Sequence, residues 1–134
     1  MYKKIIVALG LEHGHGERGI QTARRLKQEG GQIIAVHVLA PVPGFASYYL
    51  PPDHEETARD ETLKAMRLRV GKADDAKLVI LSGHPGVTIT EYAETIGADL
   101  IIVGSHKPEL QDYLLGSTAA RVVRHAPCAV HVLR

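Results

Sequence analysis

The sequence has little cysteine, no excess of charge and no long apolar run, and each of these absences excludes a class of protein. Its single cysteine, Cys128, allows neither an internal disulfide nor a cysteine metal cluster. Lys and Arg number 16 against 15 Asp and Glu, so no net field would recruit nucleic acid or an anionic membrane. No apolar run approaches the roughly 20 residues that span a bilayer.

The N-terminal segment has no secretory pattern. Met1-Tyr2-Lys3-Lys4 is followed by only about six apolar residues, too few for a signal peptide, so we expect a cytoplasmic protein. The length of 134 residues predicts one domain, 1–134, with a single core. Cys128 precedes an apolar run, where we expect a buried, inert thiol rather than a nucleophile.

Strand-like and helix-like segments alternate along the chain. Continuous apolar runs predict strands of a parallel sheet covered on both faces. Gly30-Gly31 is expected to end the first helix and Gly97 the third, which Pro85 should begin. The expected strands cover residues 4–9, 32–39, 77–81, 100–103 and 129–133, and the expected helices cover residues 17–29, 55–70, 85–96 and 117–125.

This alternation predicts an α/β fold with right-handed βαβ units and an open, doubly wound parallel sheet with helices on both faces. Such sheets bind ligands outside the carboxyl ends of their strands, near the point where the strand order reverses. We therefore expect the loops after the first and fourth strands to be neighbours in a binding site.

The only long predicted loop covers residues 40–53. It contains four of the seven prolines, the only phenylalanine and two of the five tyrosines. Aromatic residues gathered on a surface loop indicate a lid over a site or a flap that contacts a partner. The alternative is that Phe45 and Tyr48 fold back on the core.

A literal G-x-G-x-x-G, formed by Gly14, Gly16 and Gly19, follows the first strand. In a dinucleotide fingerprint the first glycine makes the strand-to-helix turn, and an acid ends the second strand. Here four residues separate the end of the predicted first strand from Gly14. The second strand ends in His37-Val38-Leu39-Ala40, which contains no acid. We favour a flexible loop entering the first helix over a dinucleotide-dependent oxidoreductase.

A second glycine pattern follows the fourth strand. Gly104-Ser105-His106-Lys107 comes directly after an apolar run, and nine residues later Gly116-Ser117-Thr118 opens a helix. Glycine lets the backbone approach a ligand closely, and N–H groups at a helix start attract anions. The pattern is typical of a phosphate-binding loop, although the same order of strand, glycine, loop and helix is also common in α/β proteins that bind no phosphate.

These motifs make the chain similar to the universal stress protein family. Its signature is Gly, two residues, Gly, nine residues, Gly, then Ser or Thr, and the order of elements agrees over the whole chain. The closest match covers residues 103–108 and 113–128 and resembles the small single-domain bacterial branch of the F and G forms. Lys107 stands at the second glycine, and the spacer after it is one residue shorter.

The resemblance implies a five-stranded sheet of order 3-2-1-4-5, Rossmann-like and of the adenine nucleotide alpha hydrolase type. It implies an adenine nucleotide as ligand, with ATP first, AMP and ADP as alternatives, and an accompanying Mg²⁺ left open. A homodimer through the last strand, Ala129–Leu133, is also implied. The residues assigned to the nucleotide are Ala8, Leu9, Gly10, Val38, Val103, Gly104, Ser105, His106, Lys107, Gly116, Ser117 and Thr118.

Several of these positions leave alternatives open. Gly10 stands where the family has an aspartate that contacts the adenosine part, so that carboxylate is missing. Val38 matches a position whose backbone meets the adenine edge. Ser117 is expected to be a helix N-cap, with or without a phosphate contact. Lys107 is either a point charge on a phosphate or a solvated loop lysine.

No catalytic constellation is visible, because neither Ser105 nor Ser117 has an evident acid–base partner. His13 and His15 lack a third ligand at a recognisable spacing, so no metal site is predicted. We expect a stress-response regulatory module that binds a nucleotide, with at most slow ATP hydrolysis or autophosphorylation. The alternative is a dimeric structural or partner-binding stress protein with a degenerate site, which Gly10 and Lys107 favour. Either function leaves room for an unknown protein partner.

Overall fold

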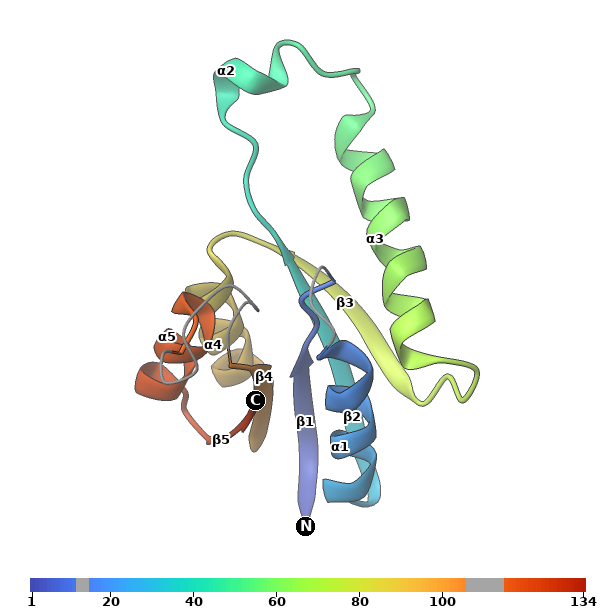
Figure 1. Ribbon diagram of the computed structural model, residues 1–134, viewed down its shortest axis with the longest axis vertical. Coiled ribbons are helices and arrows are strands. Elements are labelled where there is room, and N and C mark those ends of the chain that lie inside the picture. Colours follow the sequence, from blue (N-terminus) through green and yellow to red (C-terminus); the bar gives the residue numbers. More distant parts are fainter. Residues whose placement is uncertain (12–14, 106–114) are drawn as a thin grey trace.

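The fold is a five-stranded parallel sheet with the predicted order β3-β2-β1-β4-β5 (Figure 1). The computed structural model describes residues 1–11, 15–105 and 115–134. All four neighbouring strand pairs are parallel. The strands are β1 (Tyr2–Ala8), β2 (Lys27–Leu39), β3 (Ala76–Ser82), β4 (Leu100–Gly104) and β5 (Ala129–Leu133).

Helices cover both faces of this sheet. α1 (Gly16–Leu26) and α3 (His54–Val70) pack on one face, and α4 (Pro85–Ile96) and α5 (Ser117–His125) pack on the other (Figure 1). A short α2 (Gly44–Ser47) precedes α3. The result is the three-layer arrangement expected of a doubly wound sheet.

Two apolar cores form, rather than the single core that was predicted, because successive side chains of a strand point to opposite faces of the sheet. Ile5 and Val7 of β1 are buried with Ile20 of α1 in the first core. Ile6, between them in sequence, is buried with Ile89 of α4 in the second. The apolar runs of the sequence are continuous because both faces of the sheet are covered.

Asp99 fixes the start of β1 beside the start of β4. Its carboxylate accepts hydrogen bonds from the backbone N–H groups of Lys3 and Lys4, at 2.8 and 2.9 Å. Burial acts to raise the pKa of Asp99, but these two bonds, together with the backbone N–H of Asp99 itself and the charge of Lys3, hold the pKa below its usual value. The two strands at the reversal of strand order are thus joined at their amino ends, away from the binding edge.

The first helix is shorter than predicted. α1 ends at Leu26 rather than at residue 29, and Lys27 is already extended, with ψ at 133°. Gly30-Gly31 lies inside β2, with Gly30 at φ 76°, where the pairing of β1 with β2 shifts register. A glycine pair suits an irregularity in a strand as well as it suits a helix end. The prediction that this pair stops a helix was wrong.

The predicted ends of α4 are confirmed. Pro85 lies in the first turn of α4, and Gly97 ends the helix in the left-handed region at φ 69°. Cys128 is half-buried rather than fully buried. Burial raises the pKa of its thiol, and the charge of Asp99 adds to the rise, which disfavours the reactive thiolate.

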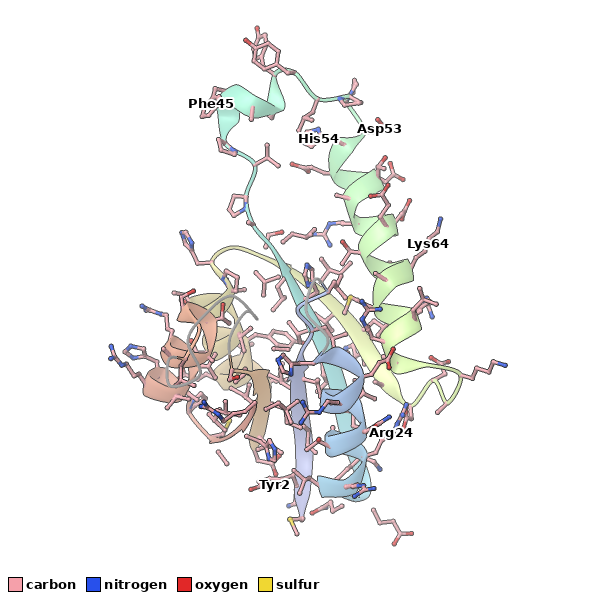
Figure 2. All side chains as sticks on the ribbon, in the orientation of Figure 1. Tyr2, Arg24, Phe45, Asp53, His54 and Lys64 are labelled. Atoms are coloured by element: carbon pink, nitrogen blue, oxygen red, sulfur yellow. The ribbon has the colours of Figure 1, made fainter. Side chains whose placement is uncertain are left out.

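Residues 40–61, which comprise α2 and the first half of α3, form an arm that projects from the sheet (Figures 1 and 2). The side chains of Phe45, Tyr48 and Tyr49 on this arm are 78%, 90% and 87% exposed. The alternative in which Phe45 and Tyr48 fold back on the core is therefore wrong. Within the described ranges, no helix combines the length and apolarity needed to cross a membrane.

Candidate functional site

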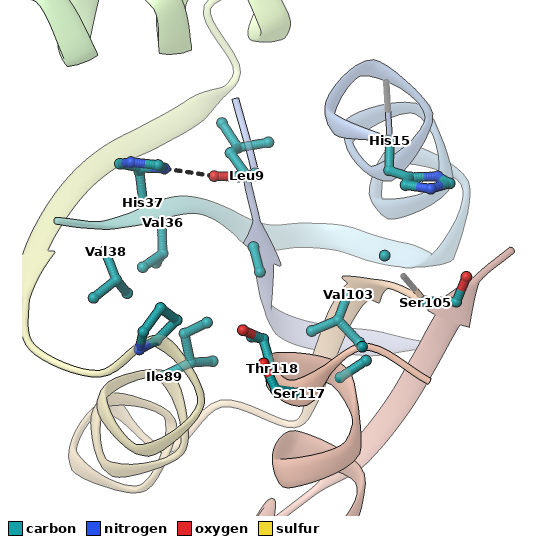
Figure 3. A pocket seen from close by; sticks show the side chains of 16 residues that line it. Leu9, His15, Val36, His37, Val38, Ile89, Val103, Ser105, Ser117 and Thr118 are labelled. Atoms are coloured by element: carbon teal, nitrogen blue, oxygen red, sulfur yellow. Dashed lines mark hydrogen bonds between the residues drawn. The ribbon is translucent and has the colours of Figure 1, made fainter. Parts of the chain in front are cut away.

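A pocket opens at the carboxyl ends of β1, β2 and β4, beside the starts of α1, α4 and α5 (Figure 3). Its volume is about 230 Å³, whereas one water molecule needs only about 10–15 Å³. The pocket therefore has room for an organic ligand. It lies where the strand order reverses, which is where open α/β sheets bind ligands.

Ten of the twelve predicted site residues line this one pocket, and the loops after β1 and β4 are neighbours as expected. His106 and Lys107 lie outside the described residues. The ten come from four separate parts of the chain, and the fold brings them together. They are Ala8, Leu9, Gly10, Val38, Val103, Gly104, Ser105, Gly116, Ser117 and Thr118.

Six further residues line the pocket that the sequence did not point to. Val36 could have been found, because it lies two residues before Val38 on the same face of β2. From the sequence, His15 was a candidate metal ligand only. Pro85 was predicted to begin a helix, but no motif linked that helix to a binding site. The six are His15, Val36, His37, Pro85, Ile89 and Ala119.

One side of the pocket is apolar. Val36 and Val38 of β2 face Ile89 of α4 (Figure 3). Pro85, the first residue of α4, also lines the pocket. Flat apolar surfaces of this kind suit the ring faces of a purine base. This side of the pocket therefore suits the uncharged part of a ligand.

The other side of the pocket is the start of α5. The N-cap is Gly116, with φ −63° and ψ 160°, and Ser117 is the first helical residue. No side chain caps this helix, so the prediction of Ser117 as N-cap was wrong by one residue. The first turn of a helix has N–H groups without intrahelical acceptors, and these groups attract anions. Gly116, Ser117 and Thr118 thus place a helix start, of the kind that attracts anions, at the pocket.

Ser105 joins the two halves of the predicted phosphate loop. It is completely buried, and its N–H donates a 2.7 Å hydrogen bond to the carbonyl of Leu133 in β5. Its own carbonyl accepts a hydrogen bond from the N–H of Gly116. The start of α5 is therefore held against the end of β4 by the backbone, which fixes this side of the pocket.

The end of β1 is held to β2 by backbone and side chain. The N–H of Leu9 donates to the carbonyl of Val36 at 2.8 Å. His37 Nδ1 lies 2.7 Å from the carbonyl of Leu9 and must be the donor, because a carbonyl only accepts (Figure 3). A Cβ built on the next residue, Gly10, would meet no atom within 4 Å. The missing carboxylate thus leaves open space at the rim of the pocket.

The G-x-G-x-x-G pattern has a packing role where it is described. A Cβ on Gly19 would lie 2.8 Å from Val7 Cγ1, so this glycine lets α1 approach β1 closely. Gly16 is the first residue of α1, and its Cβ would lie 3.3 Å from Arg69. Gly14 and the loop predicted to be flexible lie outside the described residues. A close helix–strand contact accounts for Gly19 without a dinucleotide.

The described lining of the pocket contains no acidic side chain, neither Asp nor Glu. Across the described ranges, no three His, Cys, Asp or Glu side chains come together in a group that could hold a metal ion. His13 lies outside these ranges.

Comparison with known proteins identifies the family. The Universal stress protein family matches residues 1–134. Universal stress protein G of Shigella flexneri is 32% identical over 146 residues, which cover 100% of both chains. The chain therefore belongs to the Universal stress protein family.

Solved structures share the fold. Universal stress protein UspA from Lactobacillus plantarum is 25% identical, with a TM-score of 0.71 over 99% of this chain and 98% of its own. A universal stress protein solved in complex with cAMP is 21% identical, with a TM-score of 0.61 over 99% of this chain and 97% of its own. These likenesses agree with the strand order described above.

Proposed function

We propose that this protein binds an adenine nucleotide in the pocket, with ATP as the first candidate, as a regulatory module in a stress response. The observation that carries the proposal is the gathering of ten residues, assigned by family resemblance, around one cavity. Its apolar side suits a base, and the start of α5 suits phosphates. A protein of the same fold was solved with cAMP, which supports adenine nucleotides as the ligand class.

Mass spectrometry of small molecules retained by the purified protein is the direct test. We expect an adenine nucleotide to be retained, and calorimetry to show binding of ATP, ADP or AMP, with and without Mg²⁺. UTP, which lacks a purine, is the control. A protein that retains no adenine nucleotide and binds none at millimolar concentration would contradict the proposal.

Nucleotide turnover should be slow. The described pocket residues include no carboxylate that could hold a metal ion or act as a general base. ATP hydrolysis and autophosphorylation are therefore expected to be side reactions, and the bound nucleotide to be a signal. Multiple turnovers per second in a phosphate-release assay would contradict this part of the proposal.

A second function is favoured by Gly10, which carries no carboxylate and leaves the rim of the pocket open. In this alternative the protein is a dimer that binds a partner without a nucleotide. The arm is the surface that such a partner would contact, because its aromatic side chains are exposed. An empty pocket after purification would favour this function.

Both functions fit a cytoplasmic homodimer formed through β5. This strand ends the sheet order and pairs with β4 on one side. An open edge strand is a hazard that pairing with a second copy removes. Val130→Pro should therefore yield monomers at micromolar concentration in sedimentation velocity, while the parent remains a dimer. A monomeric parent, or a variant that stays dimeric, would contradict this interface.

A further inference from the structure

His15 lies at the wall of the pocket beside the end of β4. It immediately precedes α1, and its carbonyl accepts a 2.8 Å hydrogen bond from the N–H of Gly19, which fixes its backbone. Its side chain lines the pocket. In Figure 3 it stands on the opposite side from Val38 and Ile89.

The ring of His15 packs directly on Gly104. A Cβ built on Gly104 would lie 2.9 Å from Cδ2, 3.1 Å from Cγ and 3.2 Å from Cβ of His15. Real Cβ atoms do not approach other carbon atoms so closely, so an alanine at position 104 would displace the imidazole. The absence of a side chain at Gly104 is therefore a condition for the observed position of His15.

The chemistry of the pocket determines which part of a nucleotide would meet His15. The base fits the apolar side, formed by Val36, Val38 and Ile89. The phosphates fit the start of α5, where Gly116 is joined through Ser105 to the end of β4. Gly104 and His15 lie at that end of β4, on the phosphate side. An imidazole there can donate a hydrogen bond to a phosphate oxygen.

We propose that His15 is a phosphate-contacting residue of this site and that Gly104 is small in order to admit its ring. The inference rests on the proposed nucleotide function and adds to it a residue that the family signature does not contain. On this proposal, His15 contributes to affinity only for ligands that carry phosphates. The base is held on the apolar side of the pocket.

The test is a comparison of ligands that differ only in phosphate number. Calorimetry with adenosine, AMP, ADP and ATP would be performed on the parent, His15→Ala and His15→Gln. Loss of a hydrogen bond to a charged group should weaken ATP about ten- to a hundredfold in His15→Ala and leave adenosine unchanged. His15→Gln keeps a donor and should recover part of the loss. His125→Ala, which removes an exposed histidine far along α5, is the matched control.

A double-mutant cycle tests the packing of the pair. Gly104→Ala should weaken ATP in the parent, because the new Cβ displaces the ring. The same substitution should cost less in the His15→Ala background, so the two losses should be less than additive. Fully additive losses would overturn the link between the two residues.

The outcomes separate this inference from the function beneath it. Suppose that the parent binds ATP, and that His15→Ala either weakens the binding of ATP and adenosine equally or changes neither. His15 then does not contact phosphate, and only the inference fails. If His15→Ala tightens ATP, the ring obstructs the site and the inference is overturned. If the parent itself binds no adenine nucleotide, both fail together.

Discussion

The pocket and the arm are held in place in opposite ways. The wall of the pocket depends on bonds between distant parts of the chain, such as Leu9 to Val36 and Ser105 to Leu133. Hydrogen bonds within the arm join near neighbours, such as Ser47 Oγ to the carbonyl of Gly44 at 2.8 Å. The shape of the pocket therefore depends on the whole sheet, whereas the shape of the arm depends on contacts between residues close in sequence.

This difference predicts which property a substitution in each region should affect. A change at the pocket should alter ligand binding with little loss of stability, provided that the backbone conformation suits the new residue. A change on the arm should leave both folding and the pocket intact and affect only contacts with another molecule. Three variants, ordered by expected effect, can break or sharpen this contrast.

Gly116→Val should have the largest effect. Gly116 is extended, with φ −63° and ψ 160°, so valine can adopt its backbone conformation at little cost in stability. Its branched side chain would occupy the approach to the helix start. We expect ATP affinity to fall on the order of a hundredfold in calorimetry, because contacts to charged groups are lost.

The matched control for this change is Gly44→Val on the arm. A Cβ on Gly44 would meet no atom within 4 Å. ATP affinity and thermal stability should both stay at the level of the parent. Unimpaired ATP binding by Gly116→Val would show that the phosphate side has been misplaced.

Gly10→Asp should have a smaller effect, in the opposite direction. The new side chain enters open space, and Gly10 is not among the described glycines with positive φ, so strain should not offset the gain. One hydrogen bond to the new carboxylate, at the lower end of the range for charged groups, should raise ATP affinity about tenfold. Gly10→Asn, equal in size and uncharged, is the control. Equal thermal stability without any gain in affinity would favour the partner-binding function.

Changes at the tip of the arm should have the smallest effect. Tyr48→Ser combined with Tyr49→Ser replaces two exposed side chains, so the free energy of unfolding should change by no more than about 0.5 kcal/mol. Denaturant titration measures this change. ATP affinity should also be unchanged, because the residues that line the pocket do not include the arm. A loss of affinity would show instead that the arm acts as a lid.

The sheet was predictable because its signals are local and redundant. Runs such as residues 100–103 contain no polar residue, and a parallel strand covered on both faces is the structure that such a run fits. The order of the strands was not predictable in this way. It came from the resemblance of the glycine and serine motif to a family, and the structure agrees with it.

The wrong predictions concern residues whose type is compatible with two different local structures. Gly30-Gly31 suits both a helix end and an irregular strand. Gly116 and Ser117 are both good N-caps, and the choice between them is a matter of one residue. His15 was missed for another reason: its contact with Gly104 joins the beginning of α1 to the end of β4, and no local pattern records such a contact.

The covering of both faces of the sheet by helices restricts how this fold can vary. A one-residue insertion in the regular part of β2, residues 33–39, would shift its register with β3 and move the side chains that follow to the opposite face of the sheet. The same insertion at residues 9–11, which follow β1, would leave the register of the sheet unchanged, at a free-energy cost that grows slowly with length. The carboxyl end of β1, which lines the pocket, can therefore change in length while the sheet beneath it keeps its register.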